Sequence, residues 1–195
     1  MALPYCEGLL LSAPKDEIRR ELNRFLAEVE GKAFRMARIA LRHDDDALDA
    51  VQDAMLQLAR RYATRPAAEW RPLFYRILEN RVRDLQRRRM VRSKVMALLP
   101  WRRDDGEETP DPVAEAPDHA PGPVEQAEGM GVLAALESAL ARLPPRQREA
   151  FLLRNMEGLD VAQTAAAMGC SDGSVKTHYF RAVQALKEQL GEFWT

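Results

Sequence analysis

The chain has 195 residues, of which 46% are hydrophobic, 7% aromatic and 30% charged, and its formal net charge is −1. This length suits one large domain or two small ones with real hydrophobic cores, while the low aromatic and glycine content argues against a β-sandwich. The two cysteines, Cys6 and Cys170, are too few and too far apart for a disulfide framework or a metal cluster, which favours a reducing cytoplasm.

The first 15 residues include an apolar patch but no basic n-region and no long apolar run, so they predict neither a signal peptide nor a membrane span. Apolar residues then recur at helical spacing from Ile18 to Ala40. Three aspartates, Asp44 to Asp46, come just before a second helix. They are placed to cap that helix and stabilise its dipole, whereas metal ligation would need converging ligands that the sequence does not indicate.

A third helix, which follows a loop from Ala63 to Trp70, carries a basic face. From residue 71 to residue 94 there are nine Lys or Arg residues and two acidic ones, an imbalance that the net charge conceals. A solvated basic face is the simpler explanation. The neighbouring aromatics Trp70, Phe74 and Tyr75 favour another, in which arginines hold phosphates and those aromatics outside the core contact unstacked bases. Phe74 is expected in the core. The side of this helix opposite its apolar residues carries Arg76, Asn80, Arg83, Asp84 and Arg87.

The helical pattern stops near residue 97, and residues 97–130 form a predicted acidic linker. Between residues 104 and 128 nine side chains are acidic and none is Lys or Arg, and prolines recur throughout. Such a segment cannot bury enough apolar surface to order a fold.

Helical spacing resumes at Val132 and leads to a predicted helix-turn-helix. Pro144-Pro145 begin one helix, a short helix covers Val161 to Met168, and Gly169 to Ser171 supply a break and an N-cap. Two short helices around a glycine turn, the second basic near its start, fit a helix into the DNA major groove. No strand-like alternation is visible, so the sequence predicts an all-α protein with two helical domains. The outer face of the last helix carries Lys176, Thr177, Phe180 and Arg181.

Taken together, these motifs resemble the extracytoplasmic-function (ECF) sigma factors of bacterial RNA polymerase. Asp49–Leu56 is similar to the family's helix that docks on the polymerase clamp. Phe74–Asn80, with Asp84 and Arg87–Arg89, is similar to its promoter-melting helix, which binds the −10 element. Leu143–Glu149 and Gly173–Ala182 are similar to the family's −35-reading module. The resemblance implies a region 2-like domain at 16–96, the linker at 97–130 and a region 4-like domain at 131–192.

The resemblance also implies roles for individual residues. The residues expected to bind core polymerase are Asp49, Gln52, Asp53 and Gln57. Those expected to contact −10 DNA are Arg76, Asn80, Arg83, Asp84, Arg87 and Arg88. Those expected to contact −35 DNA are Arg146, Arg148, Lys176, Thr177, His178, Phe180 and Arg181, with Arg146, Arg148 and His178 nearer the phosphates. For His178, packing beside Tyr179 is an equal alternative. The chain departs from the family pattern at Leu48, Leu73, Glu79 and Gln163.

The function implied is promoter-specific transcription initiation, with the clamp and flap regions of core RNA polymerase, promoter DNA and an anti-sigma factor as partners. The resemblance places the protein in the cytoplasm, held at the membrane only through an anti-sigma factor, without membrane insertion of its own. No catalytic residues, metal, cofactor or small-molecule substrate are expected. A freestanding helix-turn-helix transcription regulator is the alternative. The linker is expected to be either a spacer or a polyanion that enters the polymerase channels.

Overall fold

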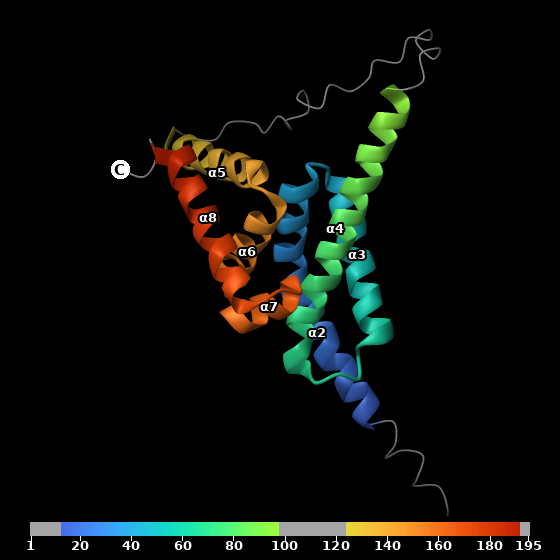
Figure 1. Cartoon of the computed structure of the whole chain (residues 1–195). Helices are drawn as coiled ribbons and strands as arrows, with labels where there is room; N and C mark the ends of the chain where they lie inside the picture. Colours follow the sequence, from blue (N-terminus) through green and yellow to red (C-terminus); the bar gives the residue numbers. More distant parts are fainter. Residues whose placement is uncertain (1–12, 98–123, 192–195) are drawn as a thin grey trace, which may run out of the picture.

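Residues 13–97 and 124–191 are described by the computed structural model of the chain, with side chains at 16–92 and 131–191. Every regular element in these ranges is an α-helix, so the predicted all-α class is confirmed (Figure 1). None of these helices is long and apolar enough to cross a membrane. They are α2 (Ala13–Leu41), α3 (Asp44–Arg61), α4 (Ala67–Ala97), α5 (Val124–Arg142), α6 (Pro145–Asn155), α7 (Val161–Met168) and α8 (Asp172–Leu190).

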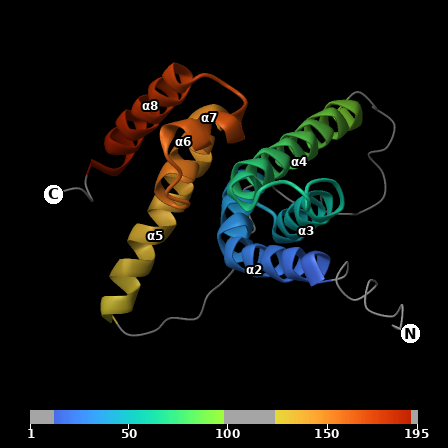
Figure 2. The same cartoon turned by 90° about the horizontal axis from the view of Figure 1, so that it is seen from below.

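Helices α2, α3 and α4 form an N-terminal block, in which α3 packs against both other helices (Figures 1 and 2). An aromatic cluster fills its lower end: the ring of Phe25 lies 6.0 Å from Trp70 and 6.2 Å from Phe74, and Phe74 lies 5.1 Å from Tyr75. Trp70, Phe74 and Tyr75 are all buried. The suggestion that aromatics of this helix contact unstacked bases is therefore wrong for this arrangement, because all three serve the core.

The turn between α2 and α3 is held by groups from three segments. His43 is the N-cap of α3, and its Nδ1 accepts a hydrogen bond from the Asp46 backbone N–H at 3.3 Å. The three aspartates thus occupy the first turn, where their charge favours the helix dipole, while the cap itself is a histidine. From α4, Gln86 donates to the Ala40 carbonyl at 2.9 Å and Arg89 donates to the Leu41 carbonyl at 2.8 Å. These bonds satisfy carbonyls at the end of α2 that have no partner within the helix.

Helices α5 to α8 form a C-terminal block that contains the predicted helix-turn-helix, α7 and α8. Asp160 and Gln163 make a reciprocal capping box at the start of α7. Gly169 ends α7 with φ of 62°, a left-handed conformation that glycine adopts without steric cost. Ser171 then caps α8 by accepting from the Ser174 N–H. Helix α5 begins at Val124, inside the predicted linker, whose residues 98–123 lie outside the described ranges.

We expect Phe74→Ala to destabilise the N-terminal block by about 3–5 kcal/mol, because it removes a fully buried ring and leaves a cavity between α2 and α4. Urea unfolding followed by far-UV circular dichroism measures the change. Phe180→Ala is the matched control, since that ring is 62% exposed. Equal unfolding midpoints for the two variants would contradict the assignment of Phe74 to the core.

Candidate nucleic-acid interface

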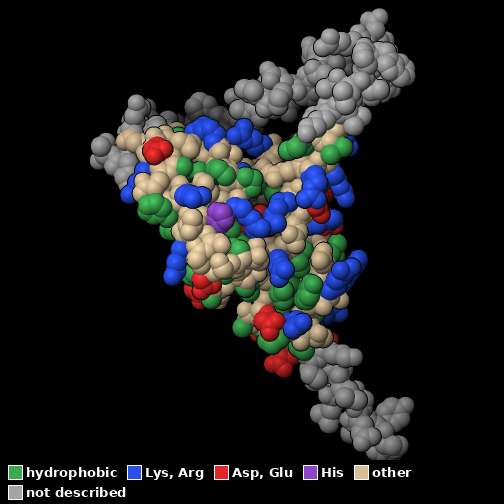
Figure 3. Space-filling model, in the orientation of Figure 1, with side chains coloured by type: hydrophobic (Ala, Val, Ile, Leu, Met, Phe, Trp, Pro, Cys, Tyr) green, Lys and Arg blue, Asp and Glu red, His purple; other side chains and the backbone are tan. Residues whose placement is uncertain are grey.

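The basic face of α4 is solvent-facing along much of its length, and Lys and Arg side chains gather along this helix in Figure 3. Arg76, Asn80, Arg87 and Arg88 are exposed, and Arg83 is half-buried. Their positions repeat at helical spacing, so one side of α4 presents several guanidinium groups together. Guanidinium groups are suited to phosphate oxygens because they donate two parallel hydrogen bonds. Asp84, predicted in the same set, lies 3.7 Å from Arg87 in an ion pair within the helix.

The outer face of α8 is also exposed and does not pack against the hydrophobic core. Val175, Ala182 and Leu186 point inward and are buried. The ring-bearing residue Phe180 is 62% exposed. Lys176, Thr177 and Arg181 are exposed on the same side, and His178 is half-buried. The helix therefore presents cationic, polar and apolar groups near its start, which is the mixture that base edges and thymine methyl groups require.

The two arginines predicted on α6 differ from the expectation. Arg148 is 7% exposed, and its Nη1 donates to the Ala141 carbonyl at 3.4 Å. Its predicted contact with DNA phosphates is therefore wrong in this arrangement, because the guanidinium does not reach the surface. Arg146 is half-buried, and its Nη1 donates to Glu149 at 3.2 Å and to the Met168 carbonyl at 2.8 Å. It joins α6 to the end of α7.

The polar side of α3 carries the residues predicted to bind the polymerase. Asp49 and Gln52 are exposed and Gln57 is half-buried, whereas Asp53 forms an ion pair with Arg81 of α4. Asp53 therefore also joins two helices of the block, a role that its sequence position did not reveal.

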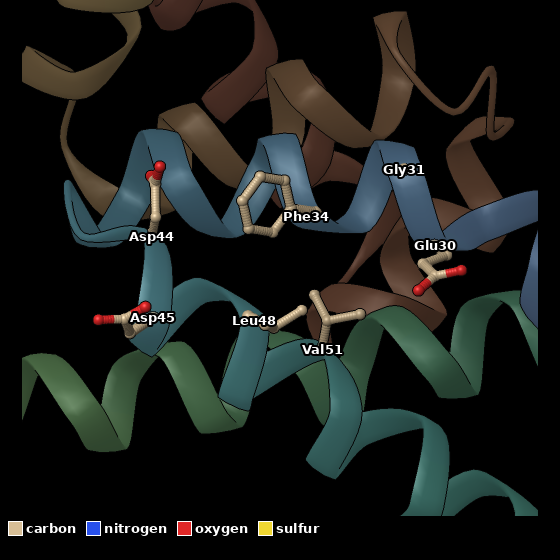
Figure 4. Close-up of a pocket in the computed structure, with 7 residues that line it drawn as sticks. All are labelled: Glu30, Gly31, Phe34, Asp44, Asp45, Leu48 and Val51. Atoms are coloured by element: carbon tan, nitrogen blue, oxygen red, sulfur yellow. The ribbon is translucent and has the colours of Figure 1, made fainter. Parts of the chain in front are cut away.

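A shallow groove between α2 and α3 adjoins this side (Figure 4). Phe34, Leu48 and Val51 supply its apolar floor, and Leu48 is 44% exposed. Three carboxylates stand at the two ends of the groove, those of Glu30, Asp44 and Asp45.

Four ion pairs join the two blocks among the described residues. Sequence reasoning missed them, since no local pattern links residues so far apart in the chain. Arg83 lies 3.2 Å from Glu149 and Arg71 lies 2.8 Å from Glu157. The sequence contains only a weak indication of the Glu149 pair, because Glu149 is the last residue of Leu143–Glu149, which resembles part of the −35-reading module. The third pair joins Arg38 and Glu137 at 2.8 Å, and the fourth joins Lys32 and Glu157 at 3.7 Å.

Charges are concentrated at this junction. Burial, and then the charge of nearby Glu149, raises the pKa of Glu79 to about 8, and burial also raises the pKa of Glu149. Arg83, Arg146 and Arg148 oppose the shift at Glu79. Glu79 is one of the departures from the family pattern, and its carboxyl group interacts with the charges of Glu149, Arg148 and Arg146 on α6. No cluster that could hold a metal ion occurs among the described residues.

Comparisons with known proteins agree with the resemblance. The family model "Sigma-70, region 4" matches residues 133–186. The ECF RNA polymerase sigma factor SigM of Mycobacterium tuberculosis is 34% identical over 162 residues, which cover 80% of this chain and 70% of SigM. The sigma factor BldN of Streptomyces coelicolor is 47% identical over 57 residues, or 29% of this chain and 22% of BldN.

A solved structure with a similar fold is the sigma factor RpoE of Bartonella quintana in complex with the anti-sigma factor NepR. It has a TM-score of 0.57 and 24% identity, and the match covers 91% of this chain and 96% of RpoE. The structure of CnrH in complex with the cytosolic domain of CnrY also has a TM-score of 0.57, with 22% identity over 89% of this chain and 90% of CnrH.

We expect the thermal stability of the chain to fall as pH rises from about 4.5 to about 8. A carboxyl group with a raised pKa stabilises the folded form below its ordinary pKa of 4.5, and this contribution is lost as pH passes through the folded value. Glu79→Gln should therefore reduce the fall in Tm, measured by differential scanning fluorimetry across this range. Glu21→Gln, an exposed glutamate on α2, should retain the full fall. Parallel curves for both variants would contradict the burial of the Glu79 charge.

Proposed function

The chain belongs to the ECF sigma factors, and we propose that the exposed faces of α3, α4 and α8 bind core polymerase, −10 DNA and −35 DNA respectively. As a sigma factor it directs transcription initiation by RNA polymerase. The match to SigM covers 80% of the chain, far more than the helix-turn-helix, so a freestanding regulator built on that motif alone is the weaker alternative. In this role the chain selects a start site, and the polymerase makes the bonds.

The α3 face suits a basic partner surface. Asp49 and Gln52 project from the side of α3 that does not pack on the block, and Leu48 continues that side into the groove of Figure 4. An apolar floor with carboxylates at its ends would hold an apolar side chain flanked by cations. We assign this surface to the polymerase clamp, with Leu48 in place of the acid that is usual in the family. Asp53 contributes less directly because it also pairs with Arg81.

The α4 face suits a DNA strand whose bases have been separated. Unstacking costs a few kcal/mol per base, and phosphate contacts from Arg76, Arg87 and Arg88 offset part of that cost because these side chains are exposed. Asn80 projects from the same side and offers an amide to a base. The buried aromatics of α4 position these residues and are not themselves contacts.

The α8 face suits the major groove of the −35 element. Lys176 and Arg181 are assigned to base edges or adjacent phosphates, and the exposed ring of Phe180 to thymine methyl groups. Thr177 donates to the Gly173 carbonyl at 2.9 Å, so its hydroxyl oxygen remains free to accept and its methyl group to pack. Arg146 reaches phosphates only if it leaves Glu149.

An anti-sigma factor is proposed as a partner, since the similar sigma factor RpoE was solved in complex with the anti-sigma factor NepR. The proposed location is the cytoplasm, where core polymerase is available. The linker at 97–130 joins the region 2-like domain (16–96) to the region 4-like domain (131–192). Replacing the linker with a neutral one of equal length would distinguish the two roles. Initiation should be unchanged if the linker is only a spacer, and should fall if it acts as a polyanion inside the polymerase.

The single observation behind this assignment is the separation of three exposed polar faces on one helical chain whose relatives are sigma factors. Run-off transcription with sigma-free core polymerase on a promoter library tests it. Selective initiation that depends on the chain is the expected result. DNA binding to duplex promoters without polymerase, and no selective initiation with it, would favour the regulator instead.

We expect Asp49→Lys to weaken binding to core polymerase about tenfold or more, because it puts a cation against a basic surface. Fluorescence anisotropy with labelled chain and sigma-free core measures this affinity. Asp16→Lys is the matched control, since Asp16 is exposed at the start of α2. The same loss for both variants would indicate a general charge effect and refute the α3 assignment.

We expect Arg181→Ala to lower initiation from the preferred −35 sequence by the equivalent of about 1–3 kcal/mol and to relax discrimination at one base position. Lys187→Ala, a basic residue near the other end of α8, should leave the preference unchanged. Run-off yields on single-base variants of the −35 element provide the measurement. An unchanged base preference for Arg181→Ala would remove this residue from base recognition.

A further inference from the structure

Gly31 lies in the interior of α2 and lines the groove of Figure 4. Glycine weakens a helix interior relative to alanine, because it loses more backbone freedom on folding. A close neighbour would account for a glycine here, but a Cβ built at this position meets no atom within 4 Å. Nothing in the described part of the chain therefore requires a residue without a side chain at Gly31. The residue is exposed, so the space that a side chain would fill lies at the mouth of the groove.

The groove beside Gly31 has an apolar floor that is only partly covered. Phe34 is half-buried and Leu48 is 44% exposed, with Val51 buried beside them. In Figure 4, Leu48 and Val51 of α3 lie opposite Phe34 of α2, and Gly31 lies about one turn before Phe34. The floor thus adjoins a stretch of bare helix backbone. Such a surface accepts an apolar side chain from a partner whose own backbone comes close to α2.

The three carboxylates at the ends of the groove, those of Glu30, Asp44 and Asp45, form no ion pair among the described residues. Other acidic residues of the same two helices are paired with arginines of α4, namely Glu28, Asp46 and Asp53. The dipole of α3 favours Asp44 and Asp45 in its first turn, but Glu30 lies in the interior of α2. Unpaired carboxylates around an apolar floor favour a partner that brings cations.

We propose that Gly31 determines which partner the groove accepts: a segment of core polymerase that lays its backbone against α2 at Gly31, places one aliphatic side chain on the floor and carries Lys or Arg on both sides of it. This inference rests on the assignment of α3 to core polymerase. It extends the docking surface from α3 to α2 and makes Gly31 a specificity-determining residue. A side chain at this position would hold the partner's backbone away from the floor.

The test adds an uncharged side chain at the mouth of the groove of the full chain. Gly31→Ala adds one methyl group and Gly31→Gln adds a longer amide side chain, and both new residues favour a helix more than glycine does. Gly131→Gln is the matched control, because Gly131 is exposed inside α5 and a Cβ built there also meets nothing within 4 Å. Thermal melting followed by far-UV circular dichroism should give all three variants a Tm equal to or above that of the parent.

Fluorescence anisotropy with labelled chain and sigma-free core polymerase measures the docking. We expect the affinity to fall about threefold for Gly31→Ala and about tenfold or more for Gly31→Gln, because the added atoms overpack the contact. Gly131→Gln should bind as the parent does. A loss of affinity in a variant that is at least as stable as the parent is a result that a structural role for Gly31 would not produce.

A second pair of variants tests the charge at the groove. Glu30→Gln should weaken binding about threefold, because one cation of the partner loses an exposed carboxylate, and should make binding less sensitive to salt. Glu21→Gln, which changes an exposed glutamate on the same helix outside the groove, should have neither effect. Equal effects of the two substitutions would contradict a cation placed at the groove.

Parent-like affinity of Gly31→Gln would overturn the inference, and so would an equal loss for Gly131→Gln. Analytical ultracentrifugation of the chain alone tests a second copy as the occupant, and a dimer that Gly31→Gln abolishes would overturn the inference too. Asp49→Lys separates it from the proposed function. If Asp49→Lys loses affinity and Gly31→Gln does not, α3 remains the polymerase surface and α2 is removed from it. A parent chain that does not bind core polymerase would refute both.

Discussion

A carboxylate that is buried away from water is stable only if it is paired with a cation. This requirement determines the contact between the N-terminal and C-terminal blocks. Glu157 has no exposed surface, and the cations that pair with it lie on α2 and α4. Glu149 is almost as deeply placed and divides its two oxygens between α4 and its own helix. Removing one partner from a buried pair is costly, which makes such contacts selective for one arrangement. The two blocks are consequently held in a particular register.

The same junction explains why a net charge of −1 is compatible with a DNA-binding role. Basic residues are concentrated on α4, acidic residues on the segment that follows it, and the cross-block pairs use part of the remaining opposite charge. Recognition of DNA by this family depends on local fields rather than on total charge.

Much of the fold could be predicted from the sequence, because helical spacing and capping are local properties. The short helix α7, its glycine end and the Ser171 cap all follow from neighbouring residues, and the structure confirms them. The fate of Trp70 and Tyr75 could not be predicted, since an aromatic next to arginines has the same pattern whether it faces solvent or the core. Arg148 misled for a similar reason: a basic residue at an outward-looking position is buried by a partner helix. The cross-block pairs depend on tertiary contacts that no local pattern encodes.

The capping of α2 by Arg89 alters what the arginine run on α4 means for salt dependence. Three successive arginines, Arg87 to Arg89, suggest three cations that could displace the counterions condensed on nucleic-acid phosphates. Arg89 is already bound to the Leu41 carbonyl and paired with Asp46. Its charge is neutralised by the protein before any nucleic acid arrives, so it releases no ion on association. The number of cations available to a nucleic acid is therefore smaller than the number of arginines in the sequence, and Arg89 instead holds the corner between α2 and α3.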